Sequence, residues 1–284
     1  MILAILLGCH LIGLVGYTLL LRKSAVGNIN KLLLAALMQT GVFLPVLVLL
    51  LLGSPLKINF SGAQWVSLAT SSLLLVGVNL TTIKALEHLE ASVFTIIYNL
   101  RLFFTTILGF IFLHELPSAL QVSGGIVIFA SILLLNLHKN RRYASTPILL
   151  GLFATVWFSV HATLEKYNVV QVGFVDYMFW AQGFAALMLW GMVLKSDVKL
   201  SAVKASFDWH TIRLVVLRVV SAWGYTYALK YGSLAVINYV SGMGVALIVL
   251  FGILLLGERN YLKQKIYAVV VAVFGLTLIL IGRL

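Results

Sequence analysis

The residues Leu113-His114-Glu115 recur as Leu256-Gly257-Glu258, 143 positions further along the chain. The same offset of 143 residues joins identical residues in both halves without a gap: Gly8 with Gly151, Lys23 with Lys166, Gln39 with Gln182, Ala85-Leu86 with Ala228-Leu229, Gly109 with Gly252, and Gln121 with Gln264. A repeat at one fixed spacing indicates a tandem duplication. We therefore divide the chain into a first copy over 1–140 and a second copy over 147–284.

The composition predicts an integral membrane protein. Hydrophobic residues make up 62% of the 284 residues and charged residues only 10%, and the mean hydropathy is +1.08. Such a chain cannot supply the charged surface of a soluble domain. The net charge of +12 lies mostly in short connectors, which is typical of cytoplasmic loops and not of a nucleic-acid-binding surface. We expect a multi-pass protein of the plasma (inner) membrane.

Ten apolar segments are close to the roughly 20 residues that a membrane-spanning helix needs. They are 2–21, 32–52, 63–83, 92–113 and 118–137 in the first copy, and 147–165, 173–194, 209–229, 233–256 and 262–282 in the second. The predicted fold is therefore all-α, with ten transmembrane helices. Because each copy has an odd number of spans, the two five-helix repeats should be inverted relative to one another, as in many secondary transporters.

The connector charges predict the orientation of the chain. Thirteen Lys and Arg residues fall in connectors on one side, and four fall on the other: Lys57, Lys166, Lys230 and Arg283. The more basic side is normally cytoplasmic, so both termini should be non-cytoplasmic.

The repeated element resembles that of the EamA-type proteins of the drug/metabolite transporter superfamily. In both copies an acidic residue follows a Leu-rich helix end, and a Gln comes six residues later. Trp157 followed by Lys166 is similar to a further pattern of this family. The resemblance covers essentially the whole chain and implies a ten-helix transporter whose first, third, fourth, sixth, eighth and ninth spans line the pathway. It also implies cytoplasmic termini, opposite to the charge count.

Two arginines lie at membrane depth, Arg101 in the span 92–113 and Arg218 in the span 209–229. A charge at the bilayer centre costs about 2.5–3.5 kcal/mol, so it usually faces a wet cavity or a partner. Neither arginine has a basic counterpart in the other copy, and no acidic residue lies near mid-span. The pair predicts a site for a carboxylate or phosphate. Alternatively, Arg101 pairs with Glu165 or backbone carbonyls, and Arg218 extends towards the membrane surface.

Polar and aromatic residues on the third, fourth, eighth and ninth spans are further candidates for the wall of a substrate cavity. These are Asn79, Tyr98, Asn99, Tyr225, Asn238 and Tyr239. The alternative is that they form hydrogen bonds between helices.

Acidic residues suggest two other roles. His161 and Glu165 are four residues apart and share a helix face, so they are a possible proton relay or a structural pair. Glu115 and Glu258 lie at span boundaries, where each is predicted to accept hydrogen bonds from the first turn of the following span.

These features favour a secondary transporter that moves a small polar, anionic or zwitterionic metabolite by alternating access. The alternatives are an exporter of hydrophobic drugs or a non-transport membrane protein. No nucleotide-binding, metal-ligand or catalytic pattern occurs, so we expect no enzyme activity, cofactor or metal. The expected partners are a small-molecule substrate and membrane lipid, without nucleic acid, for a monomer or homodimer.

Overall fold

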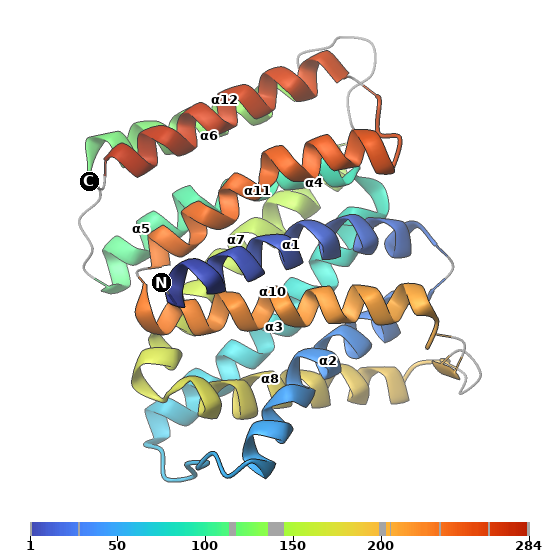
Figure 1. Ribbon diagram of the computed structural model, residues 1–284, viewed down its shortest axis with the longest axis vertical. Helices are drawn as coiled ribbons and strands as arrows, with labels where there is room; N and C mark the ends of the chain where they lie inside the picture. The colour runs from blue at the N-terminus through green and yellow to red at the C-terminus, as the bar shows by residue number, and fades with distance from the viewer. Residues whose placement is uncertain are drawn as a thin grey trace.

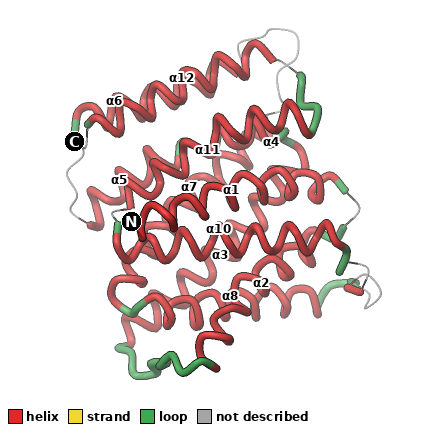
Figure 2. The backbone as a smooth tube through the Cα atoms, viewed as in Figure 1, coloured by secondary structure: helices red, strands yellow, loops and turns green. Residues whose placement is uncertain are grey.

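The computed structural model describes residues 2–27, 29–113, 118–135, 145–198, 203–204, 206–232, 234–260 and 262–282. The described residues form helices and no strands, which confirms the predicted all-α class (Figures 1 and 2). The helices are α1 (Ile2–Val26), α2 (Lys31–Leu51), α3 (Gly62–His88), α4 (Ala91–Tyr98), α5 (Arg101–Leu113), α6 (Ala119–Leu135), α7 (Ser145–Gln171), α8 (Phe174–Leu194), α10 (Trp209–Tyr231), α11 (Leu234–Leu255) and α12 (Leu262–Ile281).

Helical segments at eight places in the described chain are long and apolar enough to cross a membrane. Large apolar side chains on the outside of the bundle are highly exposed, such as Ile12 at 70% and Leu187 at 69%. A surface of this kind is stable in lipid and not in water. The chain is therefore a multi-pass membrane protein.

The helix starts follow local capping signals. Asn30 Oδ1 accepts hydrogen bonds from the backbone N–H groups of Leu32 and Leu33 at the start of α2. Ser61 and Gln64 form a capping box at the start of α3. Asp208 caps α10, because its carboxylate accepts a hydrogen bond from Thr211 N at 2.7 Å. Hydrogen bonds from the backbone and the side chain of Thr211 lower the pKa of the Asp208 carboxyl. These caps satisfy backbone donors that a helix start leaves free.

Helix pairing follows the 143-residue offset. The most extensive helix contacts are α6 with α12, α1 with α10, α3 with α7, and α2 with α8. By the offset, α6 corresponds to α12 and α2 corresponds to α8, so these two pairs join equivalent helices. Likewise α1 corresponds to α7 and α3 to α10, so the contact of α1 with α10 is equivalent to that of α7 with α3. Figure 1 shows α6 and α12 together at one edge of the bundle, with α2 and α8 at the opposite edge. The two copies therefore pack on each other through matching elements.

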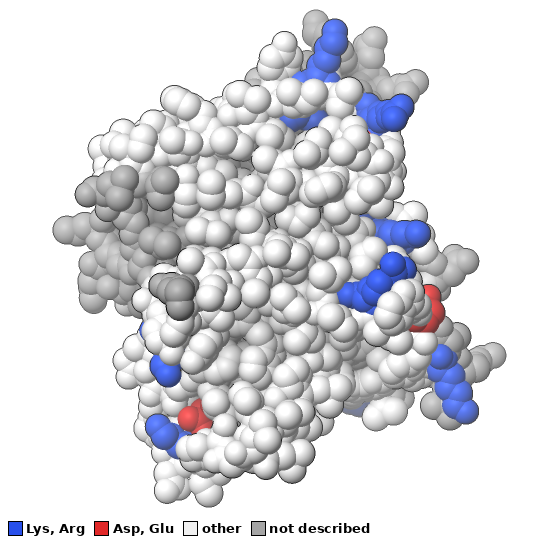
Figure 3. All heavy atoms as spheres, viewed as in Figure 1, with Lys and Arg blue, Asp and Glu red and all other residues white. Residues whose placement is uncertain are grey.

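Basic side chains gather at one end of the helices. Figure 3 shows most of the visible Lys and Arg atoms along the edge where α1 ends and α10 begins, and few at the edge that holds both termini. We refer to these edges as the basic face and the terminal face. The orientation of the two faces in a membrane stays a prediction.

The contact between α1 and α10 depends on glycine. A Cβ atom added to Gly13 would lie 2.6 Å from Ser221 N and 2.7 Å from Leu217 O, and one on Gly224 would lie 2.8 Å from Leu6 O. These neighbours are backbone atoms, which cannot move without shifting a whole helix. Small residues allow such close approach of helix backbones in membranes.

We expect Gly13→Ala to destabilise the protein by about 1–3 kcal/mol, because the new methyl group forces α1 away from α10. Gly8→Ala is the matched control, since a Cβ at Gly8 on the same helix meets nothing within 4 Å. The measurement is the melting temperature of each purified variant in detergent. Equal melting temperatures for the two variants would show that the α1–α10 contact tolerates the added carbon.

Among the described residues, the Glu258 carboxylate accepts hydrogen bonds from the start of α4 and not from the following span as predicted. The donors are Ala91 N at 2.7 Å, Ser92 N at 3.0 Å and Ser92 Oγ at 2.6 Å. Glu258 therefore caps α4 in the other copy, because that helix start lies beside the connector between α11 and α12. The first-copy counterpart, Glu115, lies outside the described residues.

Candidate functional site

The predicted fourth span is interrupted immediately before Arg101 and forms two helices. Helix α4 ends at Tyr98 and α5 begins at Arg101. At the break, Leu100 N donates to Ile97 O and Leu102 N donates to Asn99 O, each at 3.1 Å, so the chain makes short three-residue turns. Irregular backbone at membrane depth is tolerated where it is buried in protein or lines a cavity. Arg101 opens the second half-helix and is only 4% exposed.

A central cavity of about 60 Å³ lies beside this break. Helices α1, α3, α4, α5, α7 and α10 supply most of its wall. Seven of the residues predicted from the sequence line it: Asn79, Tyr98, Arg101, His161, Glu165, Arg218 and Tyr225. Its volume holds roughly four waters and is well below the roughly 300 Å³ of a small-ligand pocket. A bound metabolite therefore requires the wall to open.

Aromatic rings hold both arginines at the cavity. The Arg101 guanidinium lies over the rings of Tyr98, at 4.9 Å, and Phe158, at 5.3 Å. The Arg218 guanidinium lies over Tyr17 at 5.1 Å. Ring faces attract a cation without accepting its N–H groups in strong hydrogen bonds. Arg101 Nε has no hydrogen-bond partner within the described part of the chain, so it retains a donor for a ligand.

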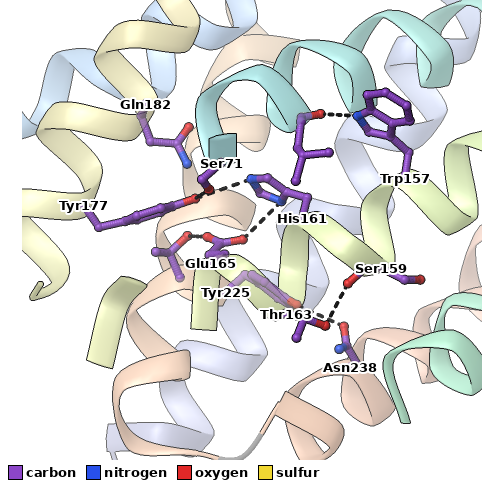
Figure 4. Close-up of polar contacts among 12 residues, drawn as sticks. Ser71, Trp157, Ser159, His161, Thr163, Glu165, Tyr177, Gln182, Tyr225 and Asn238 are labelled. Atoms are coloured by element: carbon purple, nitrogen blue, oxygen red, sulfur yellow. Dashed lines mark hydrogen bonds and ion pairs between the residues drawn. The ribbon is translucent and has the colours of Figure 1, made fainter. Parts of the chain in front are cut away.

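The wall opposite carries the one carboxylate among the residues that line this cavity. Glu165 is 3% exposed, and its Oε1 accepts a hydrogen bond from Thr226 Oγ1 at 2.6 Å. Its Oε2 lies 3.6 Å from Nδ1 of His161, one helical turn earlier on α7. Figure 4 shows the His161 ring between Glu165 and Tyr177, whose hydroxyl lies 3.4 Å from His161 Nε2. A buried acid, an imidazole and a phenol thus form one continuous group.

Three buried amides form a second network beside the cavity. Asn79 Nδ2 donates to Gln39 Oε1 at 3.0 Å, and Gln39 Nε2 donates to Gln182 Oε1 at 2.6 Å. Gln39 and Gln182 are counterparts at the 143-residue offset, so each copy contacts the other at the same position.

Three of the predicted cavity residues do not line the central cavity. Asn99 lines a second cavity of about 20 Å³, which shares Arg101 with the first. Asn238 lines neither cavity, because its Oδ1 accepts a hydrogen bond from Tyr225 OH at 3.0 Å. Tyr239 is 7% exposed, packs in the hydrophobic core and lines neither cavity. Asn238 thus makes a hydrogen bond between α10 and α11, as in the alternative prediction, and Tyr239 packs in the core.

Several lining residues were not among the sequence candidates: His10, Tyr17, Phe158, Gln182, Ser221 and Thr226. Phe158 precedes His161 by three residues and Ser221 follows Arg218 by three, so helical spacing from a candidate could have identified both. The Nδ1 of His10 lies 2.9 Å from Ser221 O, and its Nε2 lies 2.7 Å from Ser241 Oγ. It therefore links α1 to α10 and α11.

Neither central arginine forms an ion pair with a carboxylate in the described part of the chain. The alternative in which Arg101 pairs with Glu165 is therefore not observed. Within the same residues, no group of three or more His, Cys, Asp and Glu side chains is placed to hold a metal ion. The site is thus a polar, arginine-bearing cavity enclosed by aromatic rings.

Residues 2–137 match the EamA-like transporter family. A crystal structure described only as that of a protein has the same fold, with a TM-score of 0.68 at 18% sequence identity, covering 97% of this chain and 98% of that chain. No curated protein matches the chain.

Proposed function

Because the chain carries an EamA-like transporter unit over residues 2–137, we propose that it is a secondary transporter of a small anionic or zwitterionic metabolite. The observation that carries this proposal is the pair of arginines, Arg101 and Arg218, which line one buried cavity and form no ion pair with a carboxylate of the described chain. A guanidinium presents fixed N–H groups that match a carboxylate or phosphate. The ligand would supply the ion-pair partner that neither arginine has among the described residues.

The proposed mechanism is alternating access between two inverted five-helix repeats, which together make ten spans. Matching contacts at opposite ends of the bundle support the inversion. Arg22 Nη1 donates to the backbone oxygens of Leu86 and Glu87 at the end of α3, which lies at the basic face. Lys166 Nζ donates to Leu229 O, the counterpart of Leu86, at the end of α10 on the terminal face (Figure 1). In the proposed mechanism, the Arg22 contact closes the basic face in one state, and the Lys166 contact closes the terminal face in the other.

The small volume of the cavity supports an enclosed resting state. The guanidinium groups lie over the rings of Tyr17, Tyr98 and Phe158, and Tyr17 and Tyr98 also line the second cavity. Movement of these rings would join the two cavities. For a zwitterionic substrate, Glu165 is the group placed to receive an ammonium, while the arginines receive the carboxylate.

The loop charges place the basic face in the cytoplasm and both termini outside it. The duplication supplies both repeats in one chain, so a monomer is sufficient for transport, and a homodimer is compatible with the same fold. We place the protein in the plasma membrane.

A thermal-shift screen tests the function. The purified protein in detergent is melted with carboxylates, phosphates, amino acids, uncharged sugars and lipophilic cations. We expect ligands that carry a carboxylate or phosphate to raise the melting temperature, because a ligand that binds only the folded state stabilises it by mass action. Uptake of the strongest ligand into proteoliposomes then measures transport. Stabilisation by lipophilic cations alone would favour the alternative of a drug exporter and contradict the proposal.

A further inference from the structure

We propose that Glu165 is a proton-binding site that couples proton movement to the anion, so that the two are carried in the same direction. This inference rests on the proposed function, since it assigns a coupling ion to the same cavity. It follows from the position of one buried carboxylate on the same cavity as two arginines, with an imidazole and a phenol beside it.

The Glu165 carboxylate is arranged to exchange a proton at one oxygen. Oε1 is occupied by the hydrogen bond from Thr226 Oγ1 at 2.6 Å. Oε2 faces Nδ1 of His161 at 3.6 Å, and this Nδ1 has no hydrogen-bond partner in the part of the chain that the structure describes. A small side-chain rotation would bring Nδ1 and Oε2 within hydrogen-bond distance, and a water in the cavity could also bridge the two atoms. The proton therefore belongs on Oε2.

His161 can deliver that proton without gaining a net charge. With Glu165 ionised, His161 carries its proton on Nδ1. A proton arriving at Nε2 from the Tyr177 hydroxyl, 3.4 Å away, allows the Nδ1 proton to pass to Glu165 Oε2. The end state is a neutral carboxylic acid and a neutral imidazole protonated on Nε2, while Tyr177 regains its proton from its own neighbour. One proton has entered, and the two tautomers of His161 mark the two states.

The polar side chains beyond Tyr177 lead to the terminal face. Tyr177 OH lies 3.3 Å from Ser71 Oγ on α3. Ser67 lies one turn closer to the start of α3, and its hydroxyl donates to Asn168 Oδ1 at 2.7 Å. Ser61 caps this helix start, which follows the connector that contains Lys57. Figure 4 shows Ser71, Tyr177, His161 and Glu165 as one cluster, in which the Tyr177 hydroxyl contacts both Ser71 and His161. These polar groups thus extend from the cavity along α3 towards the terminal face, and water would have to bridge the step between Ser67 and Ser71.

Electrostatics fixes the direction of the coupling. Ionised Glu165 and a bound anion would both lie in one small cavity with Arg101 and Arg218, so they repel each other and compete for the same positive charge. Protonation of Glu165 removes the competing charge. The anion therefore binds more tightly to the protonated state, and by reciprocity the proton binds more tightly when the anion is present. This linkage is that of proton–anion symport and not of antiport.

The other titratable groups in the cavity wall do not replace Glu165. Tyr17, Tyr98 and Tyr225 carry phenols, which are much weaker acids than a carboxyl group. Both ring nitrogens of His10 lie within hydrogen-bond distance of Ser221 or Ser241. The side chains that α2 and α3 contribute are neutral.

The test compares the wild type with Glu165→Gln, which keeps the acceptor for Thr226 but cannot release a proton. Each is titrated, over a pH series, with the carboxylate or phosphate that gives the largest melting-temperature increase in the wild type. At pH values above the one at which Glu165 loses its proton, we expect the affinity of the wild type for the anion to fall by up to about 10-fold per pH unit. In the same pH range, each wild-type protein that binds the anion should also bind a proton, with a limit of about one proton per anion. A pH dye in weak buffer detects this uptake. Glu165→Gln should bind with a flat pH profile and no proton uptake.

Glu87→Gln is the control, because this carboxylate is 37% exposed, pairs with Lys31 at 3.8 Å and lies outside the cavity. It should behave as the wild type. Anion binding to the wild type without proton uptake, or pH dependence that persists in Glu165→Gln, would overturn the coupling while leaving the transport function intact. Failure of every anion to bind the wild type at any pH would instead overturn the function itself.

Tyr177→Phe separates the relay from the binding site. It removes the hydroxyl between His161 and Ser71 but leaves Glu165 and both arginines in place. We expect unchanged proton stoichiometry with slower proton uptake in stopped-flow measurements. Unchanged kinetics would show that protons reach Glu165 by another route.

Discussion

Replacing Arg101 with alanine is expected to weaken anion binding by about 100-fold and to abolish measurable transport. A buried charge that makes two hydrogen bonds to an opposite charge typically contributes about 2–5 kcal/mol when one partner is removed. Arg101 meets this condition, because it is 4% exposed, faces the cavity and has an Nε without a partner in the described chain. The measurement is the ligand affinity by thermal shift, followed by uptake into proteoliposomes.

Arg213→Ala is the matched control for Arg101→Ala. Arg213 is exposed at the start of α10, over the ring of Trp209 at 5.7 Å, and it does not line the central cavity. Its removal should leave affinity unchanged within about two-fold. Arg101→Lys refines the result, because an ammonium keeps the charge but loses the two-pronged geometry, so intermediate affinity is expected. Equal anion binding by Arg101→Ala and the wild type would mean that Arg101 only connects helices.

The sequence located the helices and the arginines because each leaves a strong local signal. Apolar segments bounded by charges predicted helix positions to within a few residues for α2, α8 and α12. A cation in an apolar segment is costly, so Arg101 and Arg218 stood out without any knowledge of their neighbours. Both line the cavity.

Contacts between the copies had weaker signals. The break at Asn99–Leu100 involves no proline or glycine, so the span 92–113 reads as continuous. The 143-residue offset marks Gln39 and Gln182 as counterparts but does not show that they are neighbours. Their hydrogen bond follows from how α2 packs on α8.

Tyr239 and Asn238 show why proximity in sequence is a poor guide to the side of a helix. Both belong to a polar run at the start of α11, next to the arginine-bearing helices. The rotation of α11 turns Tyr239 into the core and places Asn238 beside Tyr225. Helix rotation depends on the packing of all neighbours, and a single apolar helix carries almost no amphipathic pattern to define it.

Glu258→Ala is expected to destabilise the protein by about 2–4 kcal/mol. The carboxylate is 6% exposed and accepts three hydrogen bonds at the start of α4, so its loss leaves the N–H groups of Ala91 and Ser92 buried without an acceptor. Unsatisfied buried donors cost about 1–3 kcal/mol each. The measurement is the melting temperature in detergent. Glu87→Ala, an exposed carboxylate, should change stability by less than about 1 kcal/mol.

The consequence of Glu258→Ala for transport follows from what the carboxylate connects. Glu258 belongs to the connector between α11 and α12, and α4 leads directly to the break before Arg101. Lys265 strengthens the same junction by an ion pair with Glu90 and by a hydrogen bond from its Nζ to Glu258 O at 2.8 Å. Loss of the cap frees the start of α4 at the basic face. We therefore expect a cysteine label at the second cavity, introduced as Thr95→Cys, to react faster in Glu258→Ala than in the Glu87→Ala background. Equal labelling rates would show that Glu258 stabilises the fold without closing this face.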